Sequence, residues 1–146
     1  MLKVINSGIY SSIQDRGRFG FAHLGVPVSG VMDEVSANLA NTILGNSLEK
    51  AVLEITFGLS KFQFLSPTII CVSGANFSPK LNGNQIQLNQ LIKVKENDVL
   101  SFGSSEFGET EFDLGVGSEF RSGRNYLTAN VLSGQIRGSW SSNNDQ

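Results

Sequence analysis

The residues best suited to chemistry gather in one polar, glycine-rich stretch of the chain, residues 12–56. His23 is the only histidine in the sequence. Imidazole has the side-chain pKa nearest to neutral pH, so His23 is the natural general acid or base. Asp15 lies in the same stretch and can orient the imidazole if the fold brings the two together. The alternative is a structural histidine whose ring bonds the backbone of a turn.

Ser29 is a second candidate, because it follows a turn-forming segment and precedes Gly30. It suggests a Ser-His-Asp triad, but its surroundings lack the G-x-S-x-G pattern of the turn that exposes a nucleophilic serine in hydrolases. We therefore do not expect a serine hydrolase. The alternative is that Ser29 and Gly30 shape the start of the following helix.

Glu54 lies within an apolar run, residues 52–55. If its side chain points inward, the carboxylate needs a partner such as Arg16, Arg18 or His23, because an unpaired buried charge is costly. If strand alternation turns it outward, it is an ordinary solvated residue. Periodicity alone does not choose between the two.

Composition excludes several functions. The chain has 11 basic and 13 acidic residues and a net charge of -2. The sequence contains no run of basic residues of the kind that binds nucleic acid. One histidine, one cysteine and scattered carboxylates give no metal-ligand spacing, and residues 17–20 lack the Lys-Ser/Thr ending of a phosphate loop. Cys71 lies in an apolar run and is expected to be a buried, inert thiol. Without a signal peptide or a membrane-spanning run, we expect a soluble, cytoplasmic protein with no membrane partner.

The best helical pattern covers residues 33–44. Asp33 suits the N-cap, and Gly45 supplies a stop signal. Asn38 and Asn41 are expected to be surface or capping residues rather than ligands. A stripe of apolar residues at helical spacing predicts the buried face: Val35, Leu39, Ala40, Ile43 and Leu44.

Short strands are predicted along most of the remaining sequence, with a hairpin turn at residues 82–83. The predicted strands are residues 2–4, 52–57, 61–64, 68–72, 77–81, 85–88, 92–95, 99–102 and a further one at 126–132. Residues 9–31 are expected to form a loop that Phe19 and Phe21 anchor to the body. The pattern favours a mainly β protein, an open or closed barrel with one prominent α-helix.

Several segments, taken together and in order, resemble the carboxyltransferase-domain family. This family includes allophanate hydrolase subunit 2, the C subunit of bacterial 5-oxoprolinase, the antagonist of a sporulation-kinase inhibitor, and the carboxyltransferase part of urea amidolyase. The segments that carry the resemblance are residues 13–20, 23–33, 39–41, 44–46, 53–56, 73–76, 81–83 and 99–103. They span roughly the first two thirds of the chain, far more than a lone motif.

The resemblance implies a cyclophilin-like β-barrel and function with a partner, a protein like allophanate hydrolase subunit 1 or the B subunit of 5-oxoprolinase. It implies ATP-dependent amide or lactam hydrolysis, with ATP or biotin, where used, bound by partner chains and no cofactor on this chain. In the matching motif we expect His23 to transfer protons, Asp15 to orient it and Arg18 to clamp a substrate carboxylate. The expected substrate-binding residues are Gln14, Ser29, Asp33 and Glu54.

The resemblance also predicts how the chain is divided. Residues 1–103 are expected to form the N-terminal lobe of the domain. Residues 104–146 are expected to be a divergent or truncated segment with a partly disordered tail. We therefore expect the chain alone to be inactive. Two other functions stay open: a non-catalytic regulatory module that binds a partner, and an inactive truncated fragment.

Overall fold

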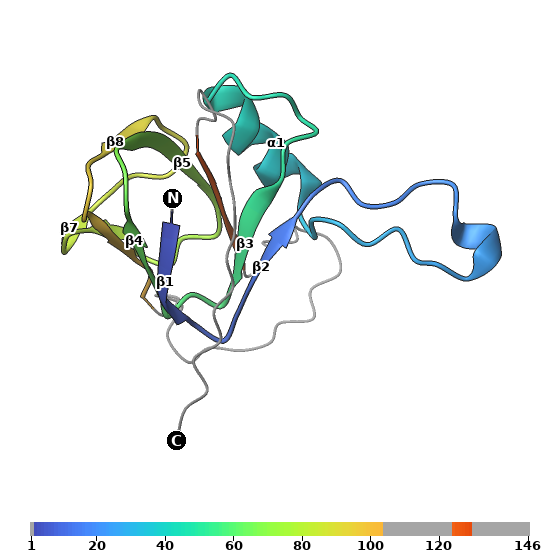
Figure 1. The fold of residues 1–146 in the computed structure, drawn as a ribbon, viewed down its shortest axis with the longest axis horizontal. Helices are drawn as coiled ribbons and strands as arrows, with labels where there is room; N and C mark the ends of the chain where they lie inside the picture. The colour runs from blue at the N-terminus through green and yellow to red at the C-terminus, as the bar shows by residue number, and fades with distance from the viewer. Residues whose placement is uncertain (1, 104–123, 130–146) are drawn as a thin grey trace, which may run out of the picture.

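The computed structural model of the protein describes residues 2–103 and 124–129 (Figure 1). The described strands form two antiparallel five-stranded sheets. Sheet A has the order β1 (Leu2–Ser7), β4 (Ser60–Phe64), β9 (Val99–Ser101), β6 (Lys80–Leu81) and β7 (Asn84–Gln85). Sheet B has the order β2 (Tyr10–Gln14), β3 (Val52–Thr56), β10 (Arg124–Ala129), β5 (Thr68–Gly74) and β8 (Ile92–Val94). The helices are η1, a 3-10 turn at Ala22–Leu24, and α1 (Glu34–Ile43).

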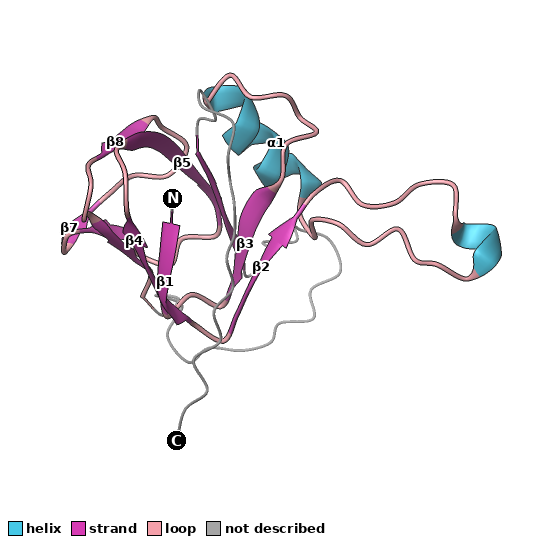
Figure 2. Cartoon of the chain, in the orientation of Figure 1, coloured by secondary structure: helices cyan, strands magenta, loops and turns pink. Residues whose placement is uncertain are grey.

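Strands dominate the described chain, and α1 is its one α-helix (Figure 2). The predicted mainly β fold with one prominent helix is confirmed. Within residues 2–103 and 124–129, no strand pairing joins sheet A to sheet B, so the closed cyclophilin-like barrel stays a prediction. No helix in the described part of the chain has both the length and the apolar character needed to cross a membrane.

The main core lies between the two sheets and takes side chains from both. It contains Leu53, Ile55, Phe62, Phe64, Ile70, Val72, Phe77, Ile92, Val94, Leu100 and Phe102. The rings of Phe62 and Phe102 meet edge to face, with centroids 6.5 Å apart and planes at 77°. Because side chains alternate along a strand, the residues between these core positions of sheet B point to its other face.

α1 covers that other face of sheet B, and its start is fixed by Asp33. One Asp33 carboxylate oxygen accepts a hydrogen bond of 3.0 Å from the Ser36 amide, and the other accepts one of 2.6 Å from the Ser36 hydroxyl. The predicted N-cap is therefore confirmed. The carboxylate also opposes the positive end of the helix dipole.

The face that α1 buries differs from the predicted stripe. The contacts with the sheet are made by Ala37 against Val52, and by Ala40 and Leu44 against Cys71. Val35 is 78% exposed and Leu39 is also exposed, so the prediction that both are buried is wrong. Small alanine side chains let the helix approach the sheet closely, and this places the larger Val35 and Leu39 outside the contact.

Three strand predictions have distinct outcomes. The hairpin at residues 82–83 is confirmed: Asn82 and Gly83 both have positive φ, as a two-residue hairpin turn requires. β2 is missing from the prediction, which treats residues 9–31 as one loop. β10 agrees with the predicted late strand and pairs with both β3 and β5, so sheet B includes residues beyond 103. The boundary after residue 103 stays a prediction, and the tail lies outside the described residues.

Candidate functional site

The predicted functional residues lie along a projecting arm and at its base. The arm, residues 15–31, leaves the end of β2, reaches η1 at its tip and returns to the start of α1 (Figure 1). Its two halves are joined near the base by two backbone hydrogen bonds. The Arg18 amide donates to the Val28 carbonyl at 2.7 Å, and the Val31 amide donates to the Asp15 carbonyl at 2.9 Å. The arm is therefore a narrow, hairpin-like extension.

Glycines allow the two halves to cross closely. A Cβ on Gly30 would lie 2.7 Å from the Arg16 carbonyl carbon, and one on Gly17 would meet the Val28 and Ser29 carbonyl oxygens. Both glycines also have positive φ, which side-chain-bearing residues rarely adopt. The base of the arm therefore depends on glycine at these positions.

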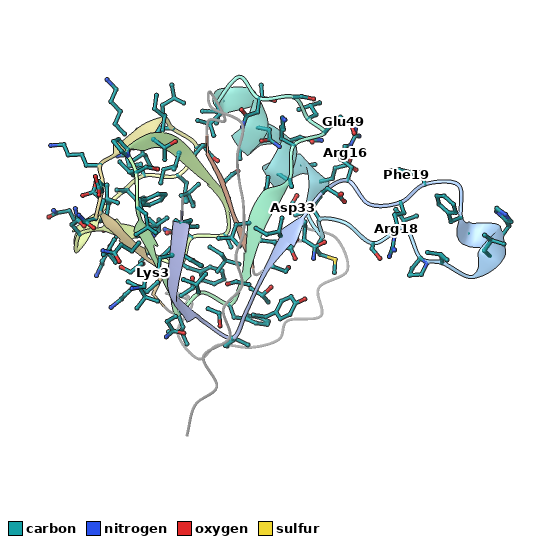
Figure 3. All side chains as sticks on the ribbon, viewed as in Figure 1. Lys3, Arg16, Arg18, Phe19, Asp33 and Glu49 are labelled. Carbon is teal, nitrogen blue, oxygen red and sulfur yellow. The ribbon has the colours of Figure 1, made fainter. Side chains whose placement is uncertain are left out.

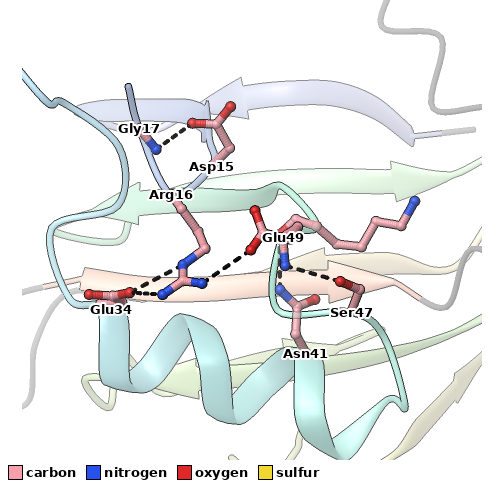
Figure 4. A network of polar contacts seen from close by, with 8 residues as sticks. Asp15, Arg16, Gly17, Glu34, Asn41, Ser47 and Glu49 are labelled. Carbon is pink, nitrogen blue, oxygen red and sulfur yellow. Dashed lines mark hydrogen bonds and ion pairs between the residues drawn. The ribbon is translucent and has the colours of Figure 1, made fainter. Parts of the chain in front are cut away.

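Arg16 ties the arm to the body through two ion pairs. Its guanidinium lies 2.8 Å from Glu34 at the start of α1 and 3.1 Å from Glu49 in the segment before β3 (Figure 4). The hydrogen bonds that Arg16 donates to Glu34, and then to Glu49, raise the pKa of Arg16 above its usual value. Because all three side chains are well exposed, salt screens this attraction.

Glu54 is the buried carboxylate at the base of the arm. It is 5% exposed and lies in β3, on the face of sheet B that α1 covers. One of its oxygens accepts a hydrogen bond of 2.9 Å from the backbone amide of Met32, just before α1 begins. Of the two interpretations left open by the sequence, burial is confirmed. Of the partners named for it, Arg16 pairs instead with the exposed carboxylates described above.

Polar residues of β2 lie beside Glu54 in sheet B. Ser12 of β2 is its register partner on one side, and Tyr126 of β10 is its register partner on the other. Gln14 follows Ser12 on the same face, and its side-chain amide donates a hydrogen bond of 3.0 Å to the Ser12 hydroxyl. With Asp33 capping α1 nearby, the predicted substrate-binding residues Gln14, Asp33 and Glu54 lie in one region, and their binding role stays a prediction.

His23 and Asp15 lie at opposite ends of the arm. His23 is exposed in η1 at the tip, whereas Asp15 directly follows β2 at the base (Figure 1). The Asp15 carboxylate accepts a hydrogen bond of 2.8 Å from the Gly17 amide (Figure 4). The fold thus does not bring the imidazole and this carboxylate together, and their paired catalytic role stays a prediction.

Large side chains on the arm point into solvent. Phe19 is 65% exposed and Phe21 is 50% exposed, so the prediction that they anchor the arm to the body is wrong. Figure 3 shows Arg18 and Phe19 on the projecting part of the arm. Within the described residues, Arg18 takes part in no ion pair, in contrast to Arg16. Its role as a clamp for a substrate carboxylate stays a prediction.

Ser29 and Gly30 have φ values of 58° and 91°, so the chain turns sharply there. This geometry agrees with the alternative in which they shape the approach to α1, and substrate binding by Ser29 stays a prediction. Asn41 is predicted to be a surface or a capping residue; it is 1% exposed, so the surface role is wrong. Its side-chain amide nitrogen donates a hydrogen bond of 2.9 Å to the Lys50 carbonyl, and its side-chain oxygen accepts one of 3.2 Å from the Asn46 side chain. Asn41 therefore caps the loop that carries Glu49, an ion-pair partner of Arg16. Only spatial proximity reveals this role.

No three histidine, cysteine, aspartate or glutamate side chains among the described residues are placed to hold a metal ion. What the region offers chemically is a buried carboxylate, amide and hydroxyl donors beside it, and an exposed imidazole and guanidinium on the arm. Such groups suit hydrogen bonding to a polar ligand and proton transfer.

Comparison with known proteins identifies the family. Residues 24–120 match the carboxyltransferase domain, subdomain A and B. The chain belongs to this family. The predicted relationship to the carboxyltransferase-domain family is therefore confirmed. The matched span contains Asp33 and Glu54, while His23, Arg18 and Asp15 precede it.

Individual relatives come from two kinds of enzyme. Urea amidolyase of Lachancea kluyveri is 38% identical over 107 residues, which cover 73% of this chain and 6% of that protein. The C subunit of 5-oxoprolinase from Escherichia coli is 30% identical over 108 residues, which cover 74% of this chain and 35% of that protein. The crystal structure of Kluyveromyces lactis urea carboxylase superposes with a TM-score of 0.73 at 39% identity, covering 88% of this chain and 10% of that chain.

The chain thus spans well under half the length of the curated relatives that it matches. Those relatives belong to larger enzymes, one of them named as a subunit. The superposition on Kluyveromyces lactis urea carboxylase covers 88% of this chain, so the chain shares the fold of that part of the enzyme.

Proposed function

We propose that this chain is the N-terminal part of a protein like the C subunit of 5-oxoprolinase or allophanate hydrolase subunit 2. In this proposal it acts in ATP-dependent hydrolysis of an amide or lactam, together with a partner like the B subunit of 5-oxoprolinase or allophanate hydrolase subunit 1. The observation that carries the proposal is the 30% identity to the C subunit of 5-oxoprolinase over 74% of this chain. The cyclophilin-like barrel belongs to the same proposal.

The geometry supports different roles for the base of the arm and for its projecting part. Gln14, Asp33 and Glu54 lie at the base of the arm, where each makes its own hydrogen bond, with Ser12, Ser36 and Met32 respectively. Arg18 and His23 are exposed on the projecting part, where a substrate held against a second protein can reach them. In the proposal, Arg18 binds a carboxylate by charge-assisted hydrogen bonds and His23 transfers a proton. ATP or biotin, where the reaction uses it, is bound by a partner chain.

The test is reconstitution of hydrolysis. The chain is mixed with a protein like the B subunit of 5-oxoprolinase, called here the B-type partner, and with the other components of that enzyme. The ATP-dependent loss of 5-oxoproline is measured, with allophanate in parallel. We expect turnover only when this chain is present. His23→Ala should lower the turnover number by about 100-fold, the contribution typical of a general acid or base. Lys50→Ala, an exposed change in the loop before β3, is the control and should leave turnover unchanged.

One observation favours a second function, a non-catalytic module that regulates the partner by binding its surface. His23 and Asp15 lie at opposite ends of the arm, so these two residues do not form an assembled acid–base pair in the described part of the chain. In that case the partner binds the chain, its activity changes, and His23→Ala has no effect on that change.

A further inference from the structure

The outer half of the arm exposes a concentrated apolar surface. Four large apolar residues there are each at least 42% exposed: Phe19, Phe21, Leu24 and Val28. Single exposed apolar residues are common on proteins. A group of them on one projecting element, rich in phenylalanine, is instead typical of a surface that a partner covers. Figure 3 shows Phe19 on a part of the chain that extends away from the sheets.

The arm holds this surface in a defined shape. Two backbone hydrogen bonds of 3.0 Å fix the tip. The amide of Leu24 donates one to the carbonyl of Phe21, and the amide of Gly25 donates the other to the carbonyl of Ala22. At the base, the close glycine crossing and the two ion pairs of Arg16 fix the direction of the arm. An element ordered before binding loses less conformational entropy when a partner covers it.

Charge indicates what kind of surface receives the arm. Residues 18–30 contain Arg18 and His23 and no aspartate or glutamate. Two copies packing arm to arm about a two-fold axis would bring the Arg18 side chains of both copies into one interface, and like charges facing one another oppose association. An apolar groove with a carboxylate at its rim complements the arm better.

We propose that the arm inserts into an apolar groove, rimmed by carboxylate, on a separate folded domain. Phe21 and Leu24 fill the groove. Arg18 lies at the rim, where its guanidinium has enough N–H donors to pair with the partner's carboxylate and also bind the substrate carboxylate of the proposed function, as Arg16 pairs with two carboxylates here. This inference rests on the proposed function, because it assigns the arm as the surface that binds the B-type partner. Aromatic and arginine side chains in such positions commonly dominate binding energy.

The experiment measures the Kd of the full chain for the B-type partner by calorimetry. One variant combines Phe21→Ser with Leu24→Ser, and a second is Arg18→Glu. The matched control is Leu91→Ser, which removes a leucine of 58% exposure just before β8, on the side of the molecule away from the arm (Figure 1). Circular dichroism and thermal melting establish that each variant is folded.

We expect the apolar double variant to raise Kd by roughly tenfold or more, and the control to match the wild type. Arg18→Glu should also raise Kd and weaken its dependence on salt. Tight wild-type binding that both arm variants retain would overturn this inference and leave the proposed function standing. An equal loss of affinity for the B-type partner in Leu91→Ser would also overturn it. So would arm variants that bind the partner normally and lose only self-association. If the wild type does not bind the B-type partner, the inference and the proposed function fail together.

Discussion

The buried carboxylate of Glu54 accepts a hydrogen bond of 2.9 Å from the backbone amide of Met32, and this contact joins β3 of sheet B to the residue that follows the arm. The arm returns to the body at this point and α1 begins immediately afterwards. Glu54 therefore helps to determine where the arm leaves the domain, in addition to any role in binding.

Replacing Glu54 should destabilise the domain in a way that depends on hydrogen-bonding capacity. Glu54→Ala leaves the Met32 amide without its acceptor and should lower the free energy of unfolding by about 1–3 kcal/mol. Glu54→Gln keeps an acceptor oxygen and should cost less. Urea denaturation of both variants measures the difference. Glu49→Ala, at an exposed carboxylate, is the control and should change stability by less than about 0.5 kcal/mol. Equal losses for Glu54→Ala and Glu54→Gln would contradict the assigned hydrogen bond.

The glycine crossing at the arm base gives a paired prediction. Gly30 and Gly20 both have positive φ, so alanine at either position adds backbone strain of about 1–2 kcal/mol. Only Gly30 is also crowded, because an added Cβ would lie 2.7 Å from Arg16 backbone, whereas Gly20 has open space around it. Gly30→Ala should therefore destabilise more than Gly20→Ala. Hydrogen exchange at the Val31 amide should speed up in Gly30→Ala only, and equal exchange rates in both variants would rule out a close crossing.

Cys71 should be unreactive in the folded protein. It is fully buried beneath α1, as the sequence predicts, and burial raises the pKa of its thiol to about 11 from a reference of 9.0. Alkylation by iodoacetamide at pH 8 should be slow in buffer and fast in urea. Because the folded protein holds the proton more tightly than the unfolded chain, stability should fall as pH rises from about 9 to 11. Cys71→Ala should remove that dependence, and rapid alkylation of the native protein would contradict burial.

Asp98 gives the opposite pH dependence. Its carboxylate accepts hydrogen bonds from the Lys95 amide at 2.7 Å and from the Asn82 side chain at 2.8 Å, and these bonds lower its pKa. The stabilisation is present at neutral pH and is lost as the pH falls through the lowered pKa, because protonation weakens both bonds. Asp98→Asn should cost about 1 kcal/mol or less at pH 7 and almost nothing near pH 2. Chemical denaturation at both pH values tests this, and an equal cost at each would contradict it.

Local sequence signals are sufficient to predict a structural feature where a backbone conformation or an unpaired backbone amide favours a few residue types. Asp33 before a helical pattern predicted the N-cap, and Asn82 with Gly83 predicted the hairpin, because few residues suit those conformations. The resemblance to the carboxyltransferase-domain family predicts the relationship of the chain as a whole. It linked segments that lie far apart in the sequence, and the family match confirms that link.

Other features depend on what lies across space. Periodicity selected Val35 and Leu39 as core, but the sheet accepts the neighbouring stripe, whose alanines permit a closer approach. The sequence of β3 is compatible with Glu54 on either face of the sheet. Glu54 is buried because α1 covers the face on which it lies, and the sequence of β3 does not reveal where α1 packs. Phe19 and Phe21 looked like anchors because large apolar residues are usually buried. On the projecting arm, no other described part of the chain is near enough to bury them.

The most direct measurement is the mass of the assembly that this chain forms with the B-type partner, determined by light scattering after size-exclusion chromatography. The proposed function predicts a single species of defined stoichiometry whose mass exceeds that of either protein. Two separate peaks, with this chain folded and monodisperse, would contradict it.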